Sequence, residues 1–315
     1  MEILHVCPAK VATGGTESIH KLVSELNKVD GVYARILYVG DYEGDPQPED
    51  YARYHCGYVT MFPEYFSGCV IFPEIYGNDV IDPKYESCIV AINWAGVDVY
   101  DWSVPKAKRG LYLKRKDCIH LAQSEYAMDH LRKLGLKGIK IEDVLNEDFF
   151  FDKYINIARN NLVLYNGAAY KLTQFQKMVM QRCRTEYGIR FQPLSGFTRH
   201  ELIDLFYQCK LYIDFGVFSG RERLPREAAM CGCCVLTSRT GAAGYHEDVP
   251  IPDKYKFTTD QVDEAMKMII HVLANYDQCK HDFDEYRTSL VHDRDVLPDQ
   301  VKELCNEIFN HNSSV

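Results

Sequence analysis

The sequence predicts an α/β protein built from two doubly wound parallel sheets. Short strands rich in β-branched and aromatic residues alternate with helical segments along the chain, which is typical of βαβ units. Several of these strands run into glycine-containing loops, at the edge where parallel sheets bind ligands. With 315 residues, the chain is long enough for two domains with separate cores.

The composition fits an ordinary globular protein and excludes several function classes. The chain has 46% hydrophobic and 26% charged residues, and its net charge of -9 argues against a nucleic-acid partner. No apolar run is long enough to span a membrane, and the chain does not begin like a signal peptide. The twelve cysteines lack the spacing of a zinc site, so we expect buried thiols in a cytoplasmic protein.

The first half of the chain predicts five strands and two helices. Runs of β-branched and aromatic residues indicate strands at residues 2–7, 34–40, 70–73, 88–93 and 118–124. Apolar residues at helical spacing indicate helices at residues 17–28 and 125–134, the second capped by Ser124 and ended by Gly135. Gly14 and Gly15 follow the first strand, where they form either a tight turn or a ligand-binding loop.

Polar and aromatic residues follow two of these strands. Glu74 comes after residues 70–73, and Asn93 with Trp94 ends the strand that begins at residue 88. Because ligands bind at the carboxyl ends of parallel strands, these three residues form a candidate ligand-binding site. Glu74 would bind the ligand or remove a proton from it. The alternative is that Glu74 is an ordinary solvated loop carboxylate.

A basic run follows, with six positive side chains and no acidic one. Its members are Lys106, Lys108, Arg109, Lys114, Arg115 and Lys116. Such a run is usually a solvated surface. The alternative is a contact with an anionic membrane leaflet or a lipid-phosphate acceptor, which would bring the protein to the cytoplasmic membrane face.

The second half of the chain repeats the alternation of strands and helices. Strands are expected at residues 162–165, 189–194, 210–215 and 233–237. Helices are expected from Thr198 onward and at residues 225–231, 258–276, 282–292 and 298–309. The helix at 258–276 has the clearest apolar stripe, with Val262, Ala265, Met266, Ile269, Ile270 and Leu273.

The stretch from Phe215 to Glu247 carries the strongest signal for function. A strand leads into a loop with three arginines, Arg221, Arg223 and Arg226, and then into a helix that contains Glu227. A second buried strand and the glycine loop Gly241–Gly244 follow. A helix N-terminus and guanidinium groups at the carboxyl edge of a parallel sheet predict a site for a diphosphate.

This stretch resembles the donor-binding signature of GT-B glycosyltransferases, especially those of the retaining family 4. The match consists of Glu227-Ala-Ala-Met-Cys-Gly232, the strand Cys233-Cys-Val-Leu-Thr237, and Gly241-Ala-Ala-Gly244 followed by Glu247. The first Glu of the family motif would fall at Ser219, so sugar recognition must differ. Gly14 and Gly15 resemble the family's glycine turn after the first strand.

The resemblance implies a GT-B fold, with two Rossmann-like domains that face a central cleft. Residues 1–150 would form the acceptor-side domain and residues 151–290 the nucleotide-sugar donor domain. Residues 291–315 would form a terminal helix that crosses back to the first domain.

The resemblance also implies roles for individual residues. Lys171, Arg221 and Arg223 would neutralise the leaving diphosphate as catalytic residues, and Glu227 would bind the donor ribose. The remaining donor-binding candidates are Gly14, Gly15, Gly167, Ser219, Gly220, Leu224 and Gly241. The strand-end residues Glu74, Asn93 and Trp94 would then bind the acceptor. Because the basic residues neutralise the diphosphate, we expect neither a metal ion nor another cofactor.

We therefore expect a glycosyltransferase that uses a UDP- or GDP-sugar and modifies a glycan, glycolipid or protein hydroxyl, with retention. One alternative is a catalytically silent GT-B-like subunit that binds a nucleotide-sugar or glycan, which the missing first Glu permits. A second is a metal-dependent GT-A enzyme using Asp282 with Asp284, or Asp293 with Asp295. These Asp-x-Asp pairs lie in a helical region rather than at a strand end, which argues against it.

Overall fold

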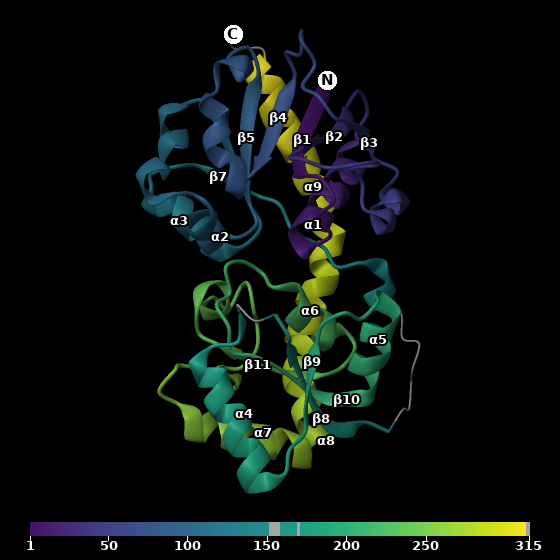
Figure 1. Ribbon diagram of the computed structural model, residues 1–315, viewed down its shortest axis with the longest axis vertical. Coiled ribbons are helices and arrows are strands. Elements are labelled where there is room, and N and C mark those ends of the chain that lie inside the picture. Colours follow the sequence, from purple (N-terminus) through teal and green to yellow (C-terminus); the bar gives the residue numbers. More distant parts are fainter. Residues whose placement is uncertain (151–157, 169–170, 313–315) are drawn as a thin grey trace. The chain divides into compact units, whose positions relative to one another are not determined.

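The computed structural model describes residues 1–150, 158–168 and 171–312. The chain forms two compact units (Figure 1). The first unit contains Met1–Asp143 and the chain from Asp295 onward, and the second contains Val144–Arg294. The domain boundary expected after residue 150 adjoins residues 151–157, which lie outside the described residues.

The described part of the first unit contains a seven-stranded parallel sheet in the order β3-β2-β1-β4-β5-β6-β7. The strands are β1 (Glu2–Pro8), β2 (Tyr33–Val39), β3 (Gly57–Val59), β4 (Cys69–Pro73), β5 (Ile89–Trp94), β6 (Ile119–Ala122) and β7 (Gly138–Lys140). Its helices are α1 (Gly14–Leu26), α2 (Val97–Ser103) and α3 (Glu125–Lys133), with 3₁₀ turns η1 (Glu49–Tyr54), η2 (Glu74–Ile81), η3 (Pro83–Tyr85), η4 (Lys106–Lys108) and η5 (Leu111–Lys114). The strand order reverses between β1 and β4, as in a doubly wound fold.

The core of the first unit explains why the sequences of its strands are continuous apolar runs. All five residues of β4 are buried, because elements cover both faces of a parallel sheet. On one face, Phe72, Ile92 and Trp94 pack with apolar residues of η2, α2 and α3. Figure 1 shows α3 beside β7 on this unit.

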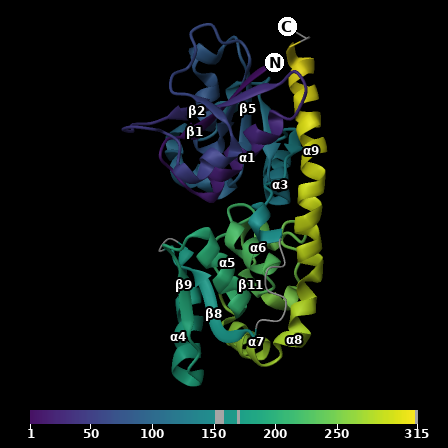
Figure 2. The ribbon, with the colours of Figure 1, turned by 90° about the vertical axis from the view of Figure 1, so that its right-hand side faces the viewer.

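The described part of the second unit contains a five-stranded parallel sheet in the order β12-β11-β10-β8-β9. Its strands are β8 (Asn160–Asn166), β9 (Phe191–Leu194), β10 (Cys209–Asp214), β11 (Cys234–Ser238) and β12 (Lys256–Phe257). Its helices are α4 (Gln174–Tyr187), α5 (Arg199–Gln208), α6 (Arg223–Met230), α7 (Val262–Ala274) and α8 (Tyr276–Cys279), with η6 (Glu147–Phe150), η8 (Gly241–Gly244), η9 (Asp253–Tyr255) and η10 (Lys280–Phe283). Figure 2 shows α4 beside β8 and β9. Here the strand order reverses between β8 and β10, so the loops after these two strands diverge.

One terminal helix replaces the two that the sequence predicts. Helix α9 (Asp284–Asn312) continues through Pro298 and belongs to the second unit up to Arg294 and to the first from Asp295. Proline costs the helix one backbone hydrogen bond. The turns after it are held to the first unit by buried Leu304 and by Gln300, whose Oε1 accepts from the backbone N–H of Glu142 at 2.8 Å. Among the described residues, no helix is both long and apolar enough to cross a membrane.

Candidate active site

The candidate site of the second unit lies where the loops after β8 and β10 diverge. Lys171, on the first loop, joins it to the second. Its Nζ donates to the backbone oxygen of Val217 at 2.7 Å and to Oε1 of Glu222 at 2.7 Å. The Lys171 side chain is 6% exposed and that of Glu222 is 22% exposed. A charged pair therefore lies at the topological switch point, where open α/β sheets bind ligands.

The start of helix α4 fixes the two loops against each other. Thr173 caps this helix by accepting from the backbone N–H of Gln176, and its Oγ1 donates to the backbone oxygen of Phe215 at 3.0 Å. Oε1 of Gln176 in turn accepts from the backbone N–H of Phe215 at 2.9 Å. These bonds hold the end of β10 against the loop that carries Lys171.

Gly216 allows Lys171 to approach the end of β10. A Cβ at Gly216 would lie 3.0 Å from Oδ1 of Asp214 and 3.1 Å from the backbone oxygen of Lys171. Both distances are shorter than ordinary van der Waals contact, so a side chain here would displace the lysine loop. Close packing therefore favours glycine at this position.

The glycine loop after β11 supports the loop after β10. Oγ of Ser238 and Oγ1 of Thr240 both donate to the backbone oxygen of Gly216, at 2.6 and 3.0 Å. The backbone N–H of Ala242 donates to the oxygen of Phe218 at 2.9 Å. Gly241 opens this loop at φ +51°, in the left-handed region that favours glycine. The predicted donor residue Gly241 thus supports the loop conformation.

Two carboxylates lie near Lys171, the buried Asp214 and the half-buried Glu222. Burial and the nearby Glu222 raise the pKa of Asp214 to about 6, against the lowering effect of Lys171. The hydroxyl of Tyr212 donates to Oδ2 of Asp214 at 3.2 Å. Burial raises the pKa of Tyr212, and the charges of Asp214, Glu222 and Glu227 raise it further, so the three carboxylates share one electrostatic neighbourhood. Our sequence analysis did not assign a role to Asp214 or Glu222.

We expected Glu227 in the first turn of its helix, because the helix was predicted to begin at Pro225. In the structure Glu227 lies beyond that turn. Helix α6 begins at Arg223 rather than at Pro225, so Glu227 is the fifth residue and has no acidic neighbour in the first turn. The dipole effect falls off within the first turn, which weakens a purely structural role for this carboxylate. Glu227 is 8% exposed, while Ser219 and Gly220 are buried and Leu224 is half-buried.

The arginines of the loop differ in their surroundings. Arg221 forms an ion pair with Asp293 of α9, with Nη2 2.7 Å from Oδ2, and only 2% of its side chain is exposed. Its charge is thus engaged by a buried carboxylate, and the diphosphate role of Arg221 stays a prediction. Arg226 is fully buried and donates to the backbone oxygens of Arg221 and Glu222, at 2.7 and 3.2 Å. The half-buried Arg223 begins α6 and stays a candidate.

Gly167 follows β8 directly. A Cβ at this position would lie 3.1 Å from Cβ of Pro193 and 3.2 Å from Oγ of Ser195. The loop after β8 therefore packs closely on the loop after β9. This gives Gly167 a packing role, and its predicted donor contact stays a prediction.

Gly14 and Gly15 lie at the carboxyl edge of the first unit's sheet. They form the first turn of α1 and not a separate loop. Thr13 and Thr16 form a capping box, in which each side chain accepts from the backbone N–H of the other, at 3.4 and 3.0 Å. This capping extends the helix three residues before the start that we predicted.

The carboxylate of Glu74 holds the loop between β5 and α2. It accepts from the backbone N–H groups of Ala95 and Gly96, at 3.3 and 3.1 Å. Burial raises its pKa to about 7, although these bonds favour the charged form. The alternative of a solvated loop carboxylate is thus wrong, since Glu74 is 5% exposed.

Asn93 and Trp94 both point into the first unit. Nδ2 of Asn93 lies 3.4 Å from Nε2 of His5, and its buried Oδ1 has no hydrogen-bond partner among the described residues. Trp94 is fully buried, and its Nε1 donates to Nδ1 of His120 at 3.2 Å. Core packing encloses the Trp94 ring, and its acceptor role stays a prediction. Asn93 stays a prediction.

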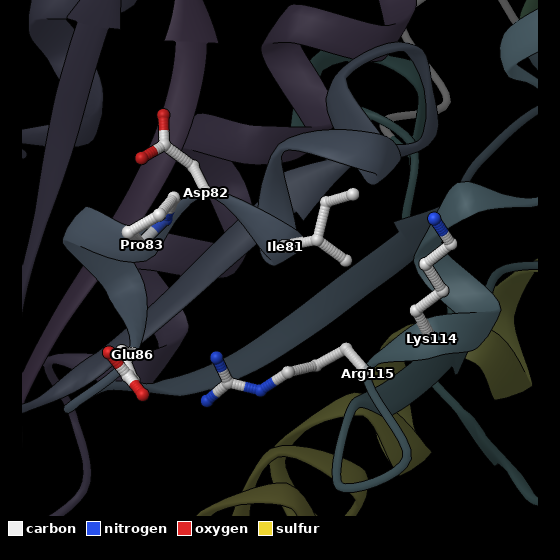
Figure 3. Close-up of a pocket in the computed structure, with 6 residues that line it drawn as sticks. All are labelled: Ile81, Asp82, Pro83, Glu86, Lys114 and Arg115. Atoms are coloured by element: carbon white, nitrogen blue, oxygen red, sulfur yellow. The ribbon is translucent and has the colours of Figure 1, made fainter.

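A pocket of about 310 Å³ lies away from these residues. It is lined by Ile81, Asp82, Pro83, Glu86, Lys114 and Arg115 (Figure 3). Arg115 extends toward Glu86 and donates to the backbone oxygens of Tyr85 and Cys88, at 3.2 and 2.7 Å. These residues precede β5 and β6, at the amino edge of the sheet. Ligands of α/β sheets bind at the other edge, so we do not assign this pocket to the donor or acceptor.

The Asp-x-Asp pairs of the GT-A alternative are engaged with basic residues. Asp282 pairs with Lys254 at 2.6 Å and Asp284 pairs with Arg287 at 2.5 Å, while Asp293 pairs with Arg221. Within the described ranges, no group of three or more His, Cys, Asp or Glu side chains could hold a metal ion. The independence from metal stays a prediction.

Together, the two doubly wound parallel-sheet units define the GT-B class of fold, which confirms the predicted fold class. No protein-family model and no curated protein sequence matches the chain. Solved structures do.

The chain is similar to a glycosyltransferase from Rickettsia africae ESF-5, with 13% identity, a TM-score of 0.68 and 98% of each chain covered. It is also similar to sucrose-phosphate synthase from Thermosynechococcus elongatus, with 12% identity, a TM-score of 0.71, and 98% of this chain and 99% of that one covered. A third similar structure is HepE from Anabaena in complex with UDP-glucose, with 11% identity, a TM-score of 0.68 and full coverage of both chains. At these identities the likeness establishes the fold.

Proposed function

We propose that this protein is a glycosyltransferase that moves a sugar from a nucleotide-sugar to a hydroxyl group of an acceptor. The observation that carries the proposal is the bridge of Lys171 to Val217 and Glu222 at the switch point of the second unit. The similar structures support it, since they include glycosyltransferases and one complex with UDP-glucose. Retention of the anomeric configuration is carried over from the resemblance to family 4.

The leaving diphosphate is the group that this site can stabilise. Lys171 and Arg223 supply positive charge beside the start of α6, where the N-cap residue Glu222 makes no side-chain capping bond. Backbone N–H groups at an uncapped helix start bind anions, and fixed positive groups stabilise charge that develops on a leaving phosphate. With these groups in place, the proposed transfer needs no metal ion or other cofactor.

The donor ribose and sugar need hydrogen-bond acceptors. Glu227 is proposed to accept from the ribose hydroxyls, because a carboxylate makes short, charge-assisted bonds to two adjacent hydroxyls. Glu222 lies in the same electrostatic neighbourhood as Glu227 and is the more exposed of the two. We therefore assign contact with the sugar to Glu222, in place of the Glu that this chain lacks at Ser219.

The partners proposed for the reaction are a nucleotide-sugar donor and a glycan, glycolipid or protein acceptor. UDP is the first nucleotide to test, because HepE is described with UDP-glucose. We propose the cytoplasm as the compartment. All twelve cysteines lie in the described part of the chain as unpaired thiols, which suits a reducing compartment.

The test compares the affinity of the wild type and Lys171→Met for UDP and for uridine. Loss of one charged hydrogen bond should weaken UDP by about 1.5–3 kcal/mol. This corresponds to roughly 10- to 150-fold in Kd. Uridine should bind equally well to both proteins. The control is Lys210→Met, because Lys210 pairs with Asn161 and Leu273 at the other end of the same sheet. Equal losses for UDP and uridine would contradict the phosphate assignment.

A silent nucleotide-sugar-binding subunit is the second candidate. Two observations favour it, namely Ser219 in place of a motif Glu and the ion pair that engages Arg221. Incubation with UDP-sugars separates the two candidates. Release of UDP, by hydrolysis or by transfer to an added acceptor, would exclude the silent subunit.

A further inference from the structure

One short segment of this acidic protein carries a net positive charge. Residues 102–116, here called the basic segment, contain six Lys and Arg residues and no acidic residue. The other 300 residues contain 30 basic and 45 acidic side chains, a balance of -15. A segment of opposite sign on an acidic protein is a site of attraction for polyanions.

The four lysines of the basic segment are exposed. Lys106, Lys108, Lys114 and Lys116 lie on the surface and form no ion pair with the described residues. The two arginines differ, since Arg109 pairs with Asp101 at 3.5 Å and Arg115 pairs with Asp117 at 2.8 Å. Four ammonium groups are thus available to an external partner.

The basic segment has a fixed backbone. Asn78 of η2 donates through Nδ2 to the backbone oxygen of Lys108 at 2.9 Å, and its Oδ1 accepts from the backbone N–H of Tyr112 at 3.2 Å. The hydroxyl of Tyr100 donates to the same Oδ1 at 3.1 Å and accepts from the backbone N–H of Gly110 at 2.7 Å. The lysines therefore extend from a braced surface, and binding need not order the backbone.

An exposed tryptophan begins this surface. Trp102 is 57% exposed at the end of α2, four residues before Lys106 in the chain. Exposed tryptophan next to lysine is typical of proteins that lie on the interface of a membrane, where the ring sits among lipid headgroups. A nucleic acid is the other polyanion that such side chains bind, through phosphate contacts and base stacking, but the net charge of -9 argues against that partner.

We propose that the basic segment binds the surface of a membrane that contains anionic lipids. The lysines attract the headgroups and Trp102 enters the interface, while the chain itself stays outside the hydrocarbon layer. The segment leads from the end of α2 to the start of β6, so it approaches the amino edge of the first unit's sheet.

The two tryptophans of the chain make this proposal directly testable. Trp94 is fully buried and Trp102 is exposed, so vesicle binding should shift only the emission of Trp102 to shorter wavelength. The experiment adds vesicles of phosphatidylcholine, with or without about one third phosphatidylglycerol, and measures emission and co-sedimentation. Binding and a blue shift are expected with the anionic vesicles alone, and salt should reverse both. The Trp102→Phe variant should bind without the shift.

A matched pair of variants tests the contribution of the lysines. Lys106, Lys108, Lys114 and Lys116 are changed to Gln in one variant, and Lys28, Lys177, Lys267 and Lys302 in the control. Both sets are exposed, so both variants should keep the wild-type Tm. The first should lose at least about tenfold in affinity for anionic vesicles, since each basic residue near the surface contributes. The control should lose less than about threefold.

Three results would overturn the proposal. The first is equal loss of vesicle binding in the two variants, which would show a general charge effect. The second is wild-type binding that is equally strong with neutral vesicles. The third is binding of double-stranded DNA by the basic segment without binding to anionic vesicles, which would assign the surface to a nucleic acid. None of these results depends on whether UDP binds.

Discussion

Arg221 offers the clearest test of how the candidate site is built. It was predicted to hold the donor diphosphate, whereas the structure buries it against Asp293 of α9. The perturbation is Arg221→Met, which keeps most of the length and apolar volume of the side chain but removes the charge. The two roles predict different losses, so one variant separates them.

The expected cost follows from the burial of the pair. The side chains of Arg221 and Asp293 are 2% and 9% exposed, and Nη2 and Oδ2 are 2.7 Å apart. Removing one partner of a buried ion pair costs about 3–5 kcal/mol, because the other charge stays desolvated. In a protein of this size, each kcal/mol lowers Tm by about 2–4 °C. Arg221→Met should therefore melt about 6–20 °C below the wild type.

The assays are thermal and urea unfolding followed by near-UV circular dichroism, with titrations of UDP and uridine on the folded variant. The double variant Arg221→Met with Asp293→Asn is the control. Neutralising Asp293 as well should recover at least about 1 kcal/mol of the loss, since the residual charge was its cause. UDP and uridine should lose affinity equally, by less than about threefold in each case.

Two results would refute this reasoning. If Arg221→Met unfolds within about 1 kcal/mol of the wild type, the ion pair does not stabilise the unit as its burial implies. If UDP instead loses tenfold or more while uridine binds normally, Arg221 leaves Asp293 to bind the diphosphate. The original assignment from the sequence would then be right.

Three further predictions concern the pKa of Glu74, the packing at Gly216 and the need for a metal ion. The pKa of Glu74 in the folded state is raised from an ordinary 4.5 to about 7, so the folded state binds the proton more tightly than the unfolded state. The free energy of unfolding should therefore fall as the pH rises through this window. Between pH 5 and pH 7.5, the urea midpoint should fall less for Glu74→Gln than for the wild type. Gly216→Ala should displace Lys171 and weaken UDP by about tenfold, whereas Gly57→Ala, whose Cβ would meet Arg35 at 3.5 Å, should leave UDP affinity unchanged. Metal stripping followed by sugar transfer in excess chelator should leave the rate unchanged, and loss of activity that Mn²⁺ restores would contradict the metal-free mechanism.

Most of the fold could be predicted because its signals are local. The strands of a parallel sheet are apolar runs, and Thr198 begins its helix with a capping box that the sequence shows directly. The errors arose where a distant contact overrides a local rule. Pro298 indicates a break, yet α9 continues through it, because buried residues on the following turns hold the helix to the first unit.

The residues of the candidate site also fall into two groups, those that the local sequence predicts and those whose role depends on a distant contact. Glu227 could be found because it belongs to a continuous motif, and Lys171 because it follows a strand at a known edge of the sheet. The partner of Arg221 is 72 residues further along the chain, and an arginine in a loop gives no sign of whether it faces a ligand or a buried carboxylate. Glu222 shows the reverse case. Glu222 does not fall at the position of a motif Glu, and only its bond to Lys171 identifies it as a residue of the candidate site.

The pairing of Lys171 with Glu222 also bears on how the site would work. A lysine that is 6% exposed carries a desolvation cost, which its bonds to Glu222 and Val217 offset. A bound diphosphate would add negative charge beside Glu222. Repulsion between this carboxylate and the diphosphate would then offset part of the attraction between Lys171 and the diphosphate. Once the diphosphate leaves, Glu222 can again pair with the lysine. The pair would thereby limit the affinity for the product UDP, which favours its release after transfer.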